Sequence, residues 1–295
     1  MATPSFHGVG VALITPFLAN GAIDYPGLER LIQFVSDGNS DYLVVQGTTG
    51  ETSTTTTQEK KDLLAFTIKH NPKNLPIVYG LGGNNTHVVL QTIQETDFEG
   101  VDAILSVCPC YNKPSQTGII AHFTAIADAS PVPVLLYNVP GRTVVNMSVS
   151  TILELTQHPN IIGIKDAGGS LEQHMEIAKF MPEGFTFLSG DDNLVTPMIS
   201  IGCMGVISVI ANAFPVEFSN LTHAALAGDF KKAAAIQYQF LTFDTLLYQE
   251  SNPVGIKECL AIKGICESHV RLPLVKASSS LSEKLKAEME KEGFI

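Results

Sequence analysis

The sequence predicts an α/β fold, and within that class a (β/α)8 TIM barrel followed by a helical appendage. Eight short segments rich in apolar or β-branched residues recur within the first 210 residues of the 295-residue chain. They mostly lie roughly thirty residues apart, which is the length of one strand–helix unit. Segments with helical periodicity occupy most of the gaps, and this alternation builds parallel sheets. A doubly wound open sheet is the weaker alternative.

The eight predicted strands carry apolar residues at both alternating sets of positions, as expected for parallel strands buried on both faces. They comprise residues 9–16, 42–46, 77–81, 103–107, 134–138, 161–165, 185–189 and 206–210. Between them, helices are predicted at residues 25–35, 58–70, 115–129 and 148–157. In the first helix, Leu28, Leu31, Ile32 and Val35 are spaced three or four residues apart and share one face.

The strand signal stops after about residue 228. Residues 229–250, 253–266 and 282–292 are predicted to be helices, and the last of these is strongly charged. We therefore divide the chain into a barrel at residues 1–228 and a C-terminal helical region at residues 229–295.

Composition excludes several classes of partner. The net charge of −11 argues against nucleic acid and anionic membrane surfaces. No run of about 18 uninterrupted apolar residues suggests a transmembrane helix, and the first six residues lack the pattern of a secretory signal. The five cysteines form no CxxC pair, which favours reduced thiols in a cytoplasmic protein. The eight histidines are scattered and mostly expected at the surface, so we predict no metal or other cofactor.

One predicted strand ends in a lysine. Alternation places Lys165 on the same side as Ile161 and Gly163, with Asp166 on the other side. An amine in this position either emerges into water or is desolvated, with a pKa below its ordinary value of about 10.4. In the second case it can attack a carbonyl group and form a Schiff base. The segment alone leaves both interpretations open.

A barrel enzyme carries its functional residues at the C-terminal ends of several strands. Polar motifs follow four other predicted strands here: GTTGE at residues 47–51, CYNKP at 110–114, YNVPGRT at 137–143 and SGDD at 189–192. Each motif has a plainer interpretation as a turn, a cap or a rim tyrosine. None is a phosphate-binding P-loop or a complete GxGxxG motif. Six polar residues at matching strand ends nevertheless favour one shared site, namely Thr48, Thr49, Tyr111, Tyr137, Arg142 and Lys165.

These motifs resemble those of the pyruvate-dependent class I aldolases and, within that superfamily, those of the dihydrodipicolinate synthase family. The likeness runs over nearly the whole chain, from the Ile-Thr-Pro segment at residues 14–16 to the Arg-Leu-Pro segment at residues 271–273. Lys165 with Tyr137 marks the superfamily. Arg142 within its YNVPGRT setting favours the synthases over the sialic-acid lyases.

The resemblance implies a lyase that condenses pyruvate with L-aspartate 4-semialdehyde through a lysine Schiff base. The product would be 4-hydroxy-tetrahydrodipicolinate, in diaminopimelate and lysine biosynthesis. Lys165 would form the imine, Tyr137 would move the proton beside it, and Thr48 would link Tyr137 to Tyr111 in a relay. The resemblance assigns substrate binding to Thr49, Arg142, Gly190 and Ile207.

Family resemblance also implies an assembly. Tyr111 would reach into the active site of a neighbouring subunit, and the assembly would be a homotetramer built from two tight dimers. Lysine-inhibited relatives bind lysine at the dimer interface with a glutamate, a tyrosine and histidines. The matching positions here are Val88, Cys110, Thr57 and Lys60, while Asn84 and Ser53 remain polar. Because the ammonium group of lysine would lose its counter-charge, we expect weak or absent inhibition by lysine.

Two other functions are weighed against this prediction. An N-acetylneuraminate lyase or a keto-deoxy-gluconate aldolase would keep Lys165 and Tyr137 but accept a sugar-like aldehyde, and Arg142 argues against it. A non-catalytic sensor of small oxo acids would not need the intact set of polar residues. Lys257 and Lys263 are rival amines, but they lie in the C-terminal helical region, where we interpret them as structural.

Overall fold

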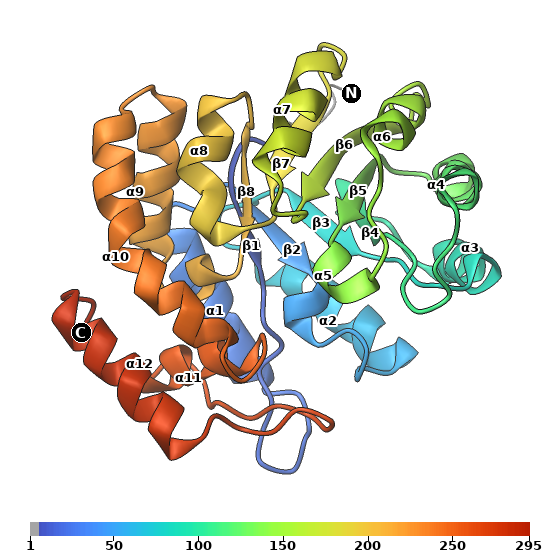
Figure 1. Ribbon diagram of the computed structural model, residues 1–295. Coiled ribbons are helices and arrows are strands. Elements are labelled where there is room, and N and C mark those ends of the chain that lie inside the picture. Colours follow the sequence, from blue (N-terminus) through green and yellow to red (C-terminus); the bar gives the residue numbers. More distant parts are fainter. Residues whose placement is uncertain (1–5) are drawn as a thin grey trace.

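The computed structural model describes residues 6–295 and forms a closed barrel of eight parallel strands in chain order (Figure 1). The strands are β1 Gly8–Ala12, β2 Tyr42–Val45, β3 Ile77–Gly80, β4 Ala103–Val107, β5 Val134–Asn138, β6 Ile161–Asp166, β7 Thr186–Ser189 and β8 Gly205–Ser208. The predicted barrel is confirmed. The open sheet is wrong, because β1 pairs with β8 and closes the ring. Most of the N-terminal stretch in which no secretory signal was expected lies outside the described residues.

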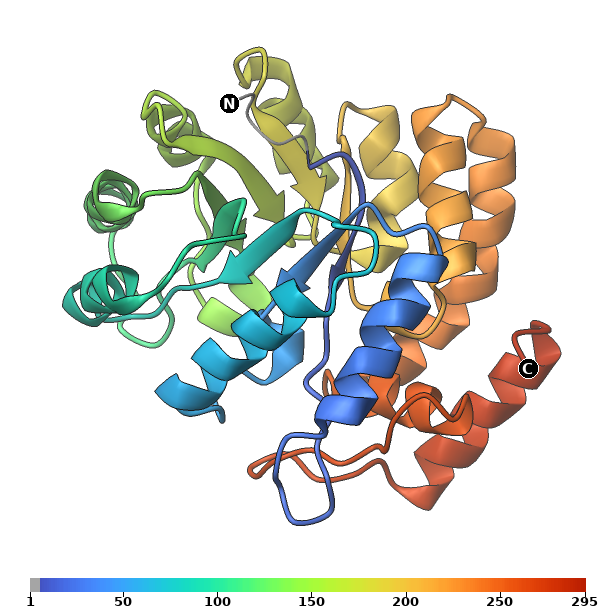
Figure 2. The same ribbon diagram turned by 180° about the vertical axis from the view of Figure 1, so that it is seen from behind.

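Helices surround the barrel (Figure 2). They are α1 Tyr25–Asp37, α2 Thr57–Lys69, α3 Thr86–Glu95, α4 Gln116–Ala129, α6 Val149–Leu155, α7 Leu171–Phe180, α8 Val195–Ser200 and α9 Pro215–Leu226. The four predicted helices correspond to α1, α2, α4 and α6, with ends that differ by at most two residues. Six of the eight begin after a side chain that accepts a hydrogen bond from the backbone N–H three residues on, which favours a helix start. These capping residues are Asp24, Thr56, Asn85, Ser115, Ser148 and Ser170.

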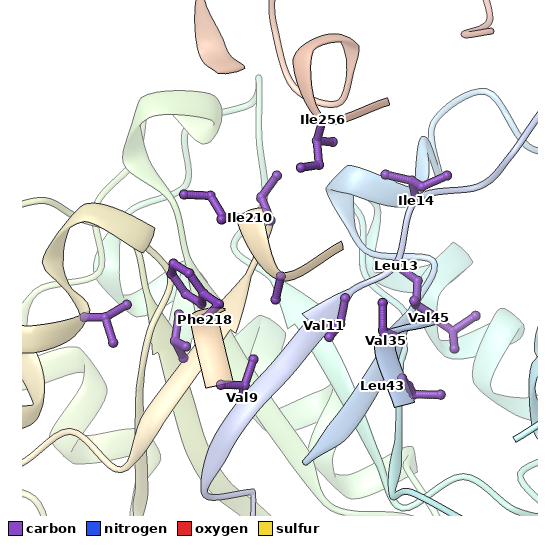
Figure 3. Close-up of a cluster of buried hydrophobic side chains, with 14 of the residues drawn as sticks. Val9, Val11, Leu13, Ile14, Val35, Leu43, Val45, Ile210, Phe218 and Ile256 are labelled. Atoms are coloured by element: carbon purple, nitrogen blue, oxygen red, sulfur yellow. The ribbon is translucent and has the colours of Figure 1, made fainter. Parts of the chain in front are cut away.

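The strands are buried on both faces, as their composition predicts. In Figure 3, Val9 and Val11 of β1 and Leu43 and Val45 of β2 belong to the outer core with Phe218 of α9. The alternate residues form an inner cluster that fills the barrel, which includes Ala12, Tyr42, Val44, Leu135 and Ile207. Full burial of each large aliphatic side chain stabilises the fold by about 1.5–3 kcal/mol.

The start of β6 departs from simple alternation. Ile161 belongs to the outer core, whereas Ile162 packs against the inner cluster. The prediction that Ile161 shares a side with Lys165 is therefore wrong. The cause is an irregularity in the β5–β6 register: Val134 pairs with Ile161, and the next residue of β5 pairs with Gly163. One extra residue in β6 thus shifts the pattern before the functional end of the strand.

The C-terminal region consists of α10 Phe230–Tyr248, α11 Val254–Ile262 and α12 Ser279–Lys291. Helix α10 packs against α8, α9, α11 and α12, so it belongs to the helical layer at that side of the barrel (Figure 1). The division of the chain at residue 228 stays a prediction. Within residues 6–295, every helix is too short or too polar to cross a membrane.

Candidate active site

Lys165 and Tyr137 lie side by side inside the barrel. They are paired in register on β6 and β5, and the Lys165 Nζ atom is 4.5 Å from the centroid of the Tyr137 ring. Only 5% of Lys165 and 7% of Tyr137 are exposed. Asp166 points to the opposite face of β6, where its carboxylate accepts a hydrogen bond from Asn138 and lies 3.2 Å from the His174 Nε2 atom. Lys165 is therefore a buried amine, and it does not emerge into water.

The GTTGE segment forms a tight helical turn, Thr48–Gly50, directly after β2. The turn is flanked by Gln46 and Glu51, whose φ angles are 59° and 54°. Residues other than glycine seldom adopt such left-handed backbone conformations, so contacts with surrounding residues must stabilise them. Thr15 stabilises both ends of the turn, because its hydroxyl donates to the Gly50 carbonyl at 2.7 Å and accepts a hydrogen bond from Gln46.

Glu51 anchors the far end of this turn through a buried ion pair with Lys257 of α11. The Lys257 side chain is fully buried, and its Nζ atom also donates to the His269 carbonyl at 2.8 Å. The second Glu51 oxygen accepts a hydrogen bond from the backbone N–H of Arg271 at 3.0 Å. Burial lowers the pKa of Lys257, and Glu51 opposes this shift. Lys257 thus ties the C-terminal region to the turn.

A cavity of about 270 Å³ opens beside Lys165. Six of the eight predicted site residues line it: Thr48, Thr49, Tyr137, Arg142, Lys165 and Gly190. Arg142 is exposed, and among residues 6–295 no carboxylate forms an ion pair with its guanidinium group. The cavity therefore combines a buried amine, hydroxyl groups and a guanidinium group that is free to bind an anion.

The two other predicted residues lie elsewhere. Ile207 of β8 belongs to the inner core and is 1% exposed. Tyr111 follows β4 with a φ angle of 71°, and 88% of it is exposed. Neither residue lines the cavity. Within one chain, the predicted relay from Tyr137 through Thr48 is therefore incomplete at Tyr111.

Gly190 leaves the space that the Lys165 side chain occupies. A Cβ atom at this position would lie 2.8 Å from the Ala167 Cβ atom and 2.9 Å from the Lys165 Cε atom. Contacts below 3.0 Å force neighbouring atoms to move. The residue type at position 190 thus constrains where the amine can lie.

Sequence reasoning missed four polar residues of the cavity, namely Asp191, Asp244, Tyr248 and Asn252. Asp191 stood within the recognised SGDD motif and offered a signal. The others come from α10 and the segment after it, where no strand end directs attention to them. Burial raises the pKa of Asp191. Burial also raises the pKa of Asp244, to about 8, together with the nearby negative charges of Asp192 and Asp191.

Most of the eight histidines are expected at the surface, and two of them, His122 and His174, are buried. The Nδ1 atom of His122 lies 2.8 Å from the Thr86 hydroxyl, and burial lowers the pKa of this imidazole to about 4. Within the described part of the chain, no three histidine, cysteine or acidic residues form a group that could hold a metal ion.

Comparison with known proteins gives a consistent result. The family model described as the dihydrodipicolinate synthetase family matches residues 5–292. The 4-hydroxy-tetrahydrodipicolinate synthase of Cytophaga hutchinsonii is 49% identical over 281 residues, which cover 95% of each chain.

Solved structures agree with this relationship. The dihydrodipicolinate synthase of Aquifex aeolicus superposes with a TM-score of 0.93 at 38% identity, with 98% of each chain covered. The chloride-inhibited enzyme of Acinetobacter baumannii, solved in complex with pyruvate, superposes with a TM-score of 0.95 at 34% identity. That alignment covers 99% of this chain and 100% of the other. The predicted lyase class and family are confirmed: the chain belongs to the dihydrodipicolinate synthetase family.

Proposed function

We propose that the chain acts as a 4-hydroxy-tetrahydrodipicolinate synthase in which Lys165 forms the Schiff base with pyruvate. The observation that carries the assignment is the buried Lys165 amine beside Tyr137, in a cavity that also presents Arg142. The Cytophaga hutchinsonii relative is named 4-hydroxy-tetrahydrodipicolinate synthase and the Aquifex aeolicus structure is named dihydrodipicolinate synthase, and each aligns with this chain over nearly its full length. Pyruvate is the ligand named for the Acinetobacter baumannii structure.

The chemistry proceeds through an imine. The Lys165 amine attacks the ketone carbon of pyruvate, and loss of water gives the imine. Loss of a proton from the methyl group gives an enamine, whose carbon attacks the aldehyde of L-aspartate 4-semialdehyde. The substrate amine then closes the ring by attacking the imine carbon and releases Lys165. Covalent catalysis of this kind divides one difficult step into several easier steps.

Tyr137 is the proposed proton carrier. Its ring lies against the Lys165 amine, and a hydroxyl can both donate and accept a hydrogen bond, as repeated proton transfers at one centre require. Thr48 would connect this hydroxyl to Tyr111 of a neighbouring subunit. This proposal gives the exposed Tyr111 a partner and implies at least a dimer. The family resemblance extends it to a homotetramer in the cytoplasm.

Two anchors hold the substrate carboxylates. The first N–H groups of a helical turn have no partner within the turn, so those of Thr48 and Thr49 suit the pyruvate carboxylate. The Gly190 and Ile207 backbones would complete the pyruvate site. Arg142 suits the carboxylate of the semialdehyde, because a planar guanidinium group can donate two parallel hydrogen bonds to it.

The proposal is tested by following pyruvate consumption by NMR with three aldehydes at equal concentration. L-aspartate 4-semialdehyde, N-acetylmannosamine and glyceraldehyde are compared, and we expect consumption with the semialdehyde alone. The Arg142→Ala variant should lose most of this activity and still form a borohydride-trapped adduct with pyruvate. Preference for a sugar-like aldehyde would move the chain to the lyase branch, and no consumption would leave a binding protein.

Weak inhibition by lysine is a further part of the proposal. Thr57, Lys60, Asn84 and Val88 line a cavity of about 230 Å³ that has no acidic residue among its lining residues. Burial lowers the pKa of Lys60. The amine of Lys60 nevertheless lies in the cavity where a lysine ligand would place its own amine. We expect millimolar lysine to leave most activity intact. Half-inhibition by submillimolar lysine would contradict this, and Val88→Glu should increase lysine sensitivity.

A further inference from the structure

One wall of the active-site cavity is acidic. Asp191 precedes the short helical turn Asp192–Leu194, and Asp244 lies on α10. Both line the cavity that contains Lys165. Among residues 6–295, no lysine, arginine or histidine forms an ion pair with either carboxylate. Their polar contacts are neutral, because the Asn193 side chain donates to Asp244 at 2.8 Å and the Asn193 N–H donates to Asp191 at 3.0 Å.

The same wall contains a buried acceptor without a donor. Asn252 is 8% exposed and lines the cavity. Its Nδ2 atom donates to the Thr49 hydroxyl at 3.0 Å. Its Oδ1 atom is buried and has no hydrogen-bond partner in the described chain. Buried polar atoms are nearly always paired, so this oxygen indicates a ligand that carries a hydrogen-bond donor.

The aldehyde substrate has a group that fits this wall. L-aspartate 4-semialdehyde carries a carboxylate and an ammonium group on the same carbon atom. With the carboxylate bound by Arg142, the ammonium group still has three N–H donors that need acceptors. Lys165 and Arg142 are the cations of the cavity, and like charge would repel the ammonium group from them.

We infer that Asp244, Asp191 and the Asn252 Oδ1 atom bind the α-ammonium group of the aldehyde substrate. The inference rests on the proposed function and assigns amino-acid specificity to Asp191 of the SGDD motif together with Asp244 and Asn252, which no sequence motif identifies. Sugar-like aldehydes and simple oxo acids lack this cation. The acidic wall therefore selects among aldehydes, whereas Lys165 and Tyr137 serve the Schiff-base chemistry with pyruvate.

The electrostatics of the cavity agree with this assignment. Asp192, the buried neighbour of Asp191, adds a third carboxyl group, and among residues 6–295 no basic side chain forms an ion pair with it. Burial raises the pKa of Asp244 to about 8, and the nearby charges of Asp192 and Asp191 contribute to this shift. A cation bound at the wall relieves this repulsion and favours the ionised form of Asp244.

The test compares two aldehydes that differ only in the ammonium group. L-aspartate 4-semialdehyde is used as substrate, and succinate semialdehyde, which lacks the amine, is used as its competitor. At saturating pyruvate, Asp244→Asn should raise the KM for the substrate roughly tenfold to a hundredfold, as expected for losing a hydrogen bond to a charged group. The inhibition constant of succinate semialdehyde should change less than about twofold.

Matched variants separate this effect from simpler ones. Arg142→Ala should weaken the binding of both aldehydes, because both carry the carboxylate. Thr245→Ala, an exposed neighbour on α10, should leave both constants unchanged. Asp191→Asn is a second variant of the acidic wall should Asp244→Asn fold poorly, and borohydride trapping of pyruvate checks that each variant keeps its amine in place.

The outcomes are distinct. Weakening confined to L-aspartate 4-semialdehyde supports the ammonium site. The ammonium site is overturned if the variants weaken the binding of both aldehydes equally. It is also overturned if neither Asp244→Asn nor Asp191→Asn changes the binding of either aldehyde. Both outcomes leave the synthase activity of the wild type intact. If the wild type consumes no pyruvate with L-aspartate 4-semialdehyde, the proposed function fails first, and the ammonium site fails with it.

Discussion

At the scale of single residues, Gly190 decides whether the Lys165 amine can lie where the structure places it. A methyl group at position 190 would come within 3.0 Å of both Ala167 and Lys165. We expect Gly190→Ala to lower kcat by roughly tenfold to a hundredfold, since small displacements of a catalytic group are costly. The measurement is the steady-state rate with pyruvate and L-aspartate 4-semialdehyde.

Gly83→Ala is the matched control for this substitution. Its new methyl group would approach no atom closer than 3.4 Å, which is ordinary contact. The control should keep wild-type kcat. An unchanged rate in Gly190→Ala would show that Lys165 can be displaced without loss, and the steric argument would then fail.

Lys165 also makes a direct chemical prediction. Lys165→Ala should abolish the pyruvate adduct that borohydride traps, with the adduct measured by the mass of the intact chain. Lys263→Ala should keep it, because the half-buried Lys263 amine lies against the Phe214 ring, outside the cavity. A trapped adduct in Lys165→Ala would place the Schiff base on another amine.

At the scale of elements, the buried ion pair between Glu51 and Lys257 holds the turn after β2 against α11. Removing one partner leaves an uncompensated buried charge, which typically costs about 3–5 kcal/mol. We expect Lys257→Met to lower the free energy of unfolding by about this amount, measured by denaturant titration. Pyruvate adduct formation should also slow, because Glu51 ends the turn that carries Thr48 and Thr49.

Two comparisons make this prediction specific. Lys286→Met removes an exposed lysine that lies 4.0 Å from Glu290 on α12, and it should cost about 0.5 kcal/mol or less. The double variant Glu51→Gln with Lys257→Met should recover part of the lost stability, since no charge is then buried alone. Equal stability of Lys257→Met and the wild type would contradict a stabilising role for the ion pair between Glu51 and Lys257.

The elements that sequence predicted well are those with a local physical cause. Strands buried on both faces show continuous apolar runs, and helices such as α1 and α4 begin after capping side chains. The prediction failed at Ile161, where an extra residue in β6 shifts the pairing with β5. Alternation within one strand carries no information about its partner's register, so this irregularity has no signal in the local pattern.

At the scale of the whole molecule, the candidate site divides in the same way. Lys165, Tyr137 and Arg142 follow strands, and barrel topology alone brings strand ends together. Asp244 and Asn252 reach the cavity only because α10 and the segment after it pack beside the barrel mouth. Their place depends on tertiary packing of distant segments, which neither motif spacing nor periodicity reveals. The position of Tyr111 is harder still to predict from the sequence, because its proposed site lies on another subunit.

That proposal for Tyr111 can be tested by mixing two impaired variants. Within one chain Tyr111 is 88% exposed and does not line the cavity. If it completes a neighbour's site, Tyr111→Phe and Lys165→Ala fall together in one of the two sites of a mixed dimer. The site built from the intact Lys165 of one chain and the intact Tyr111 of the other then remains whole. Random pairing in equal amounts should restore about a quarter of wild-type activity, because half of the dimers are mixed and each has one whole site.

The control for mixing is Tyr111→Phe combined with a double variant that carries both substitutions. No pairing of these chains contains both an intact Lys165 and an intact Tyr111 at one site, so activity should stay at the level of the impaired variants. Activity of the first mixture should also rise with the time allowed for subunits to exchange, since the gain requires new dimers. A first mixture that stays at the average of its two parents would place Tyr111 within its own subunit or outside the reaction.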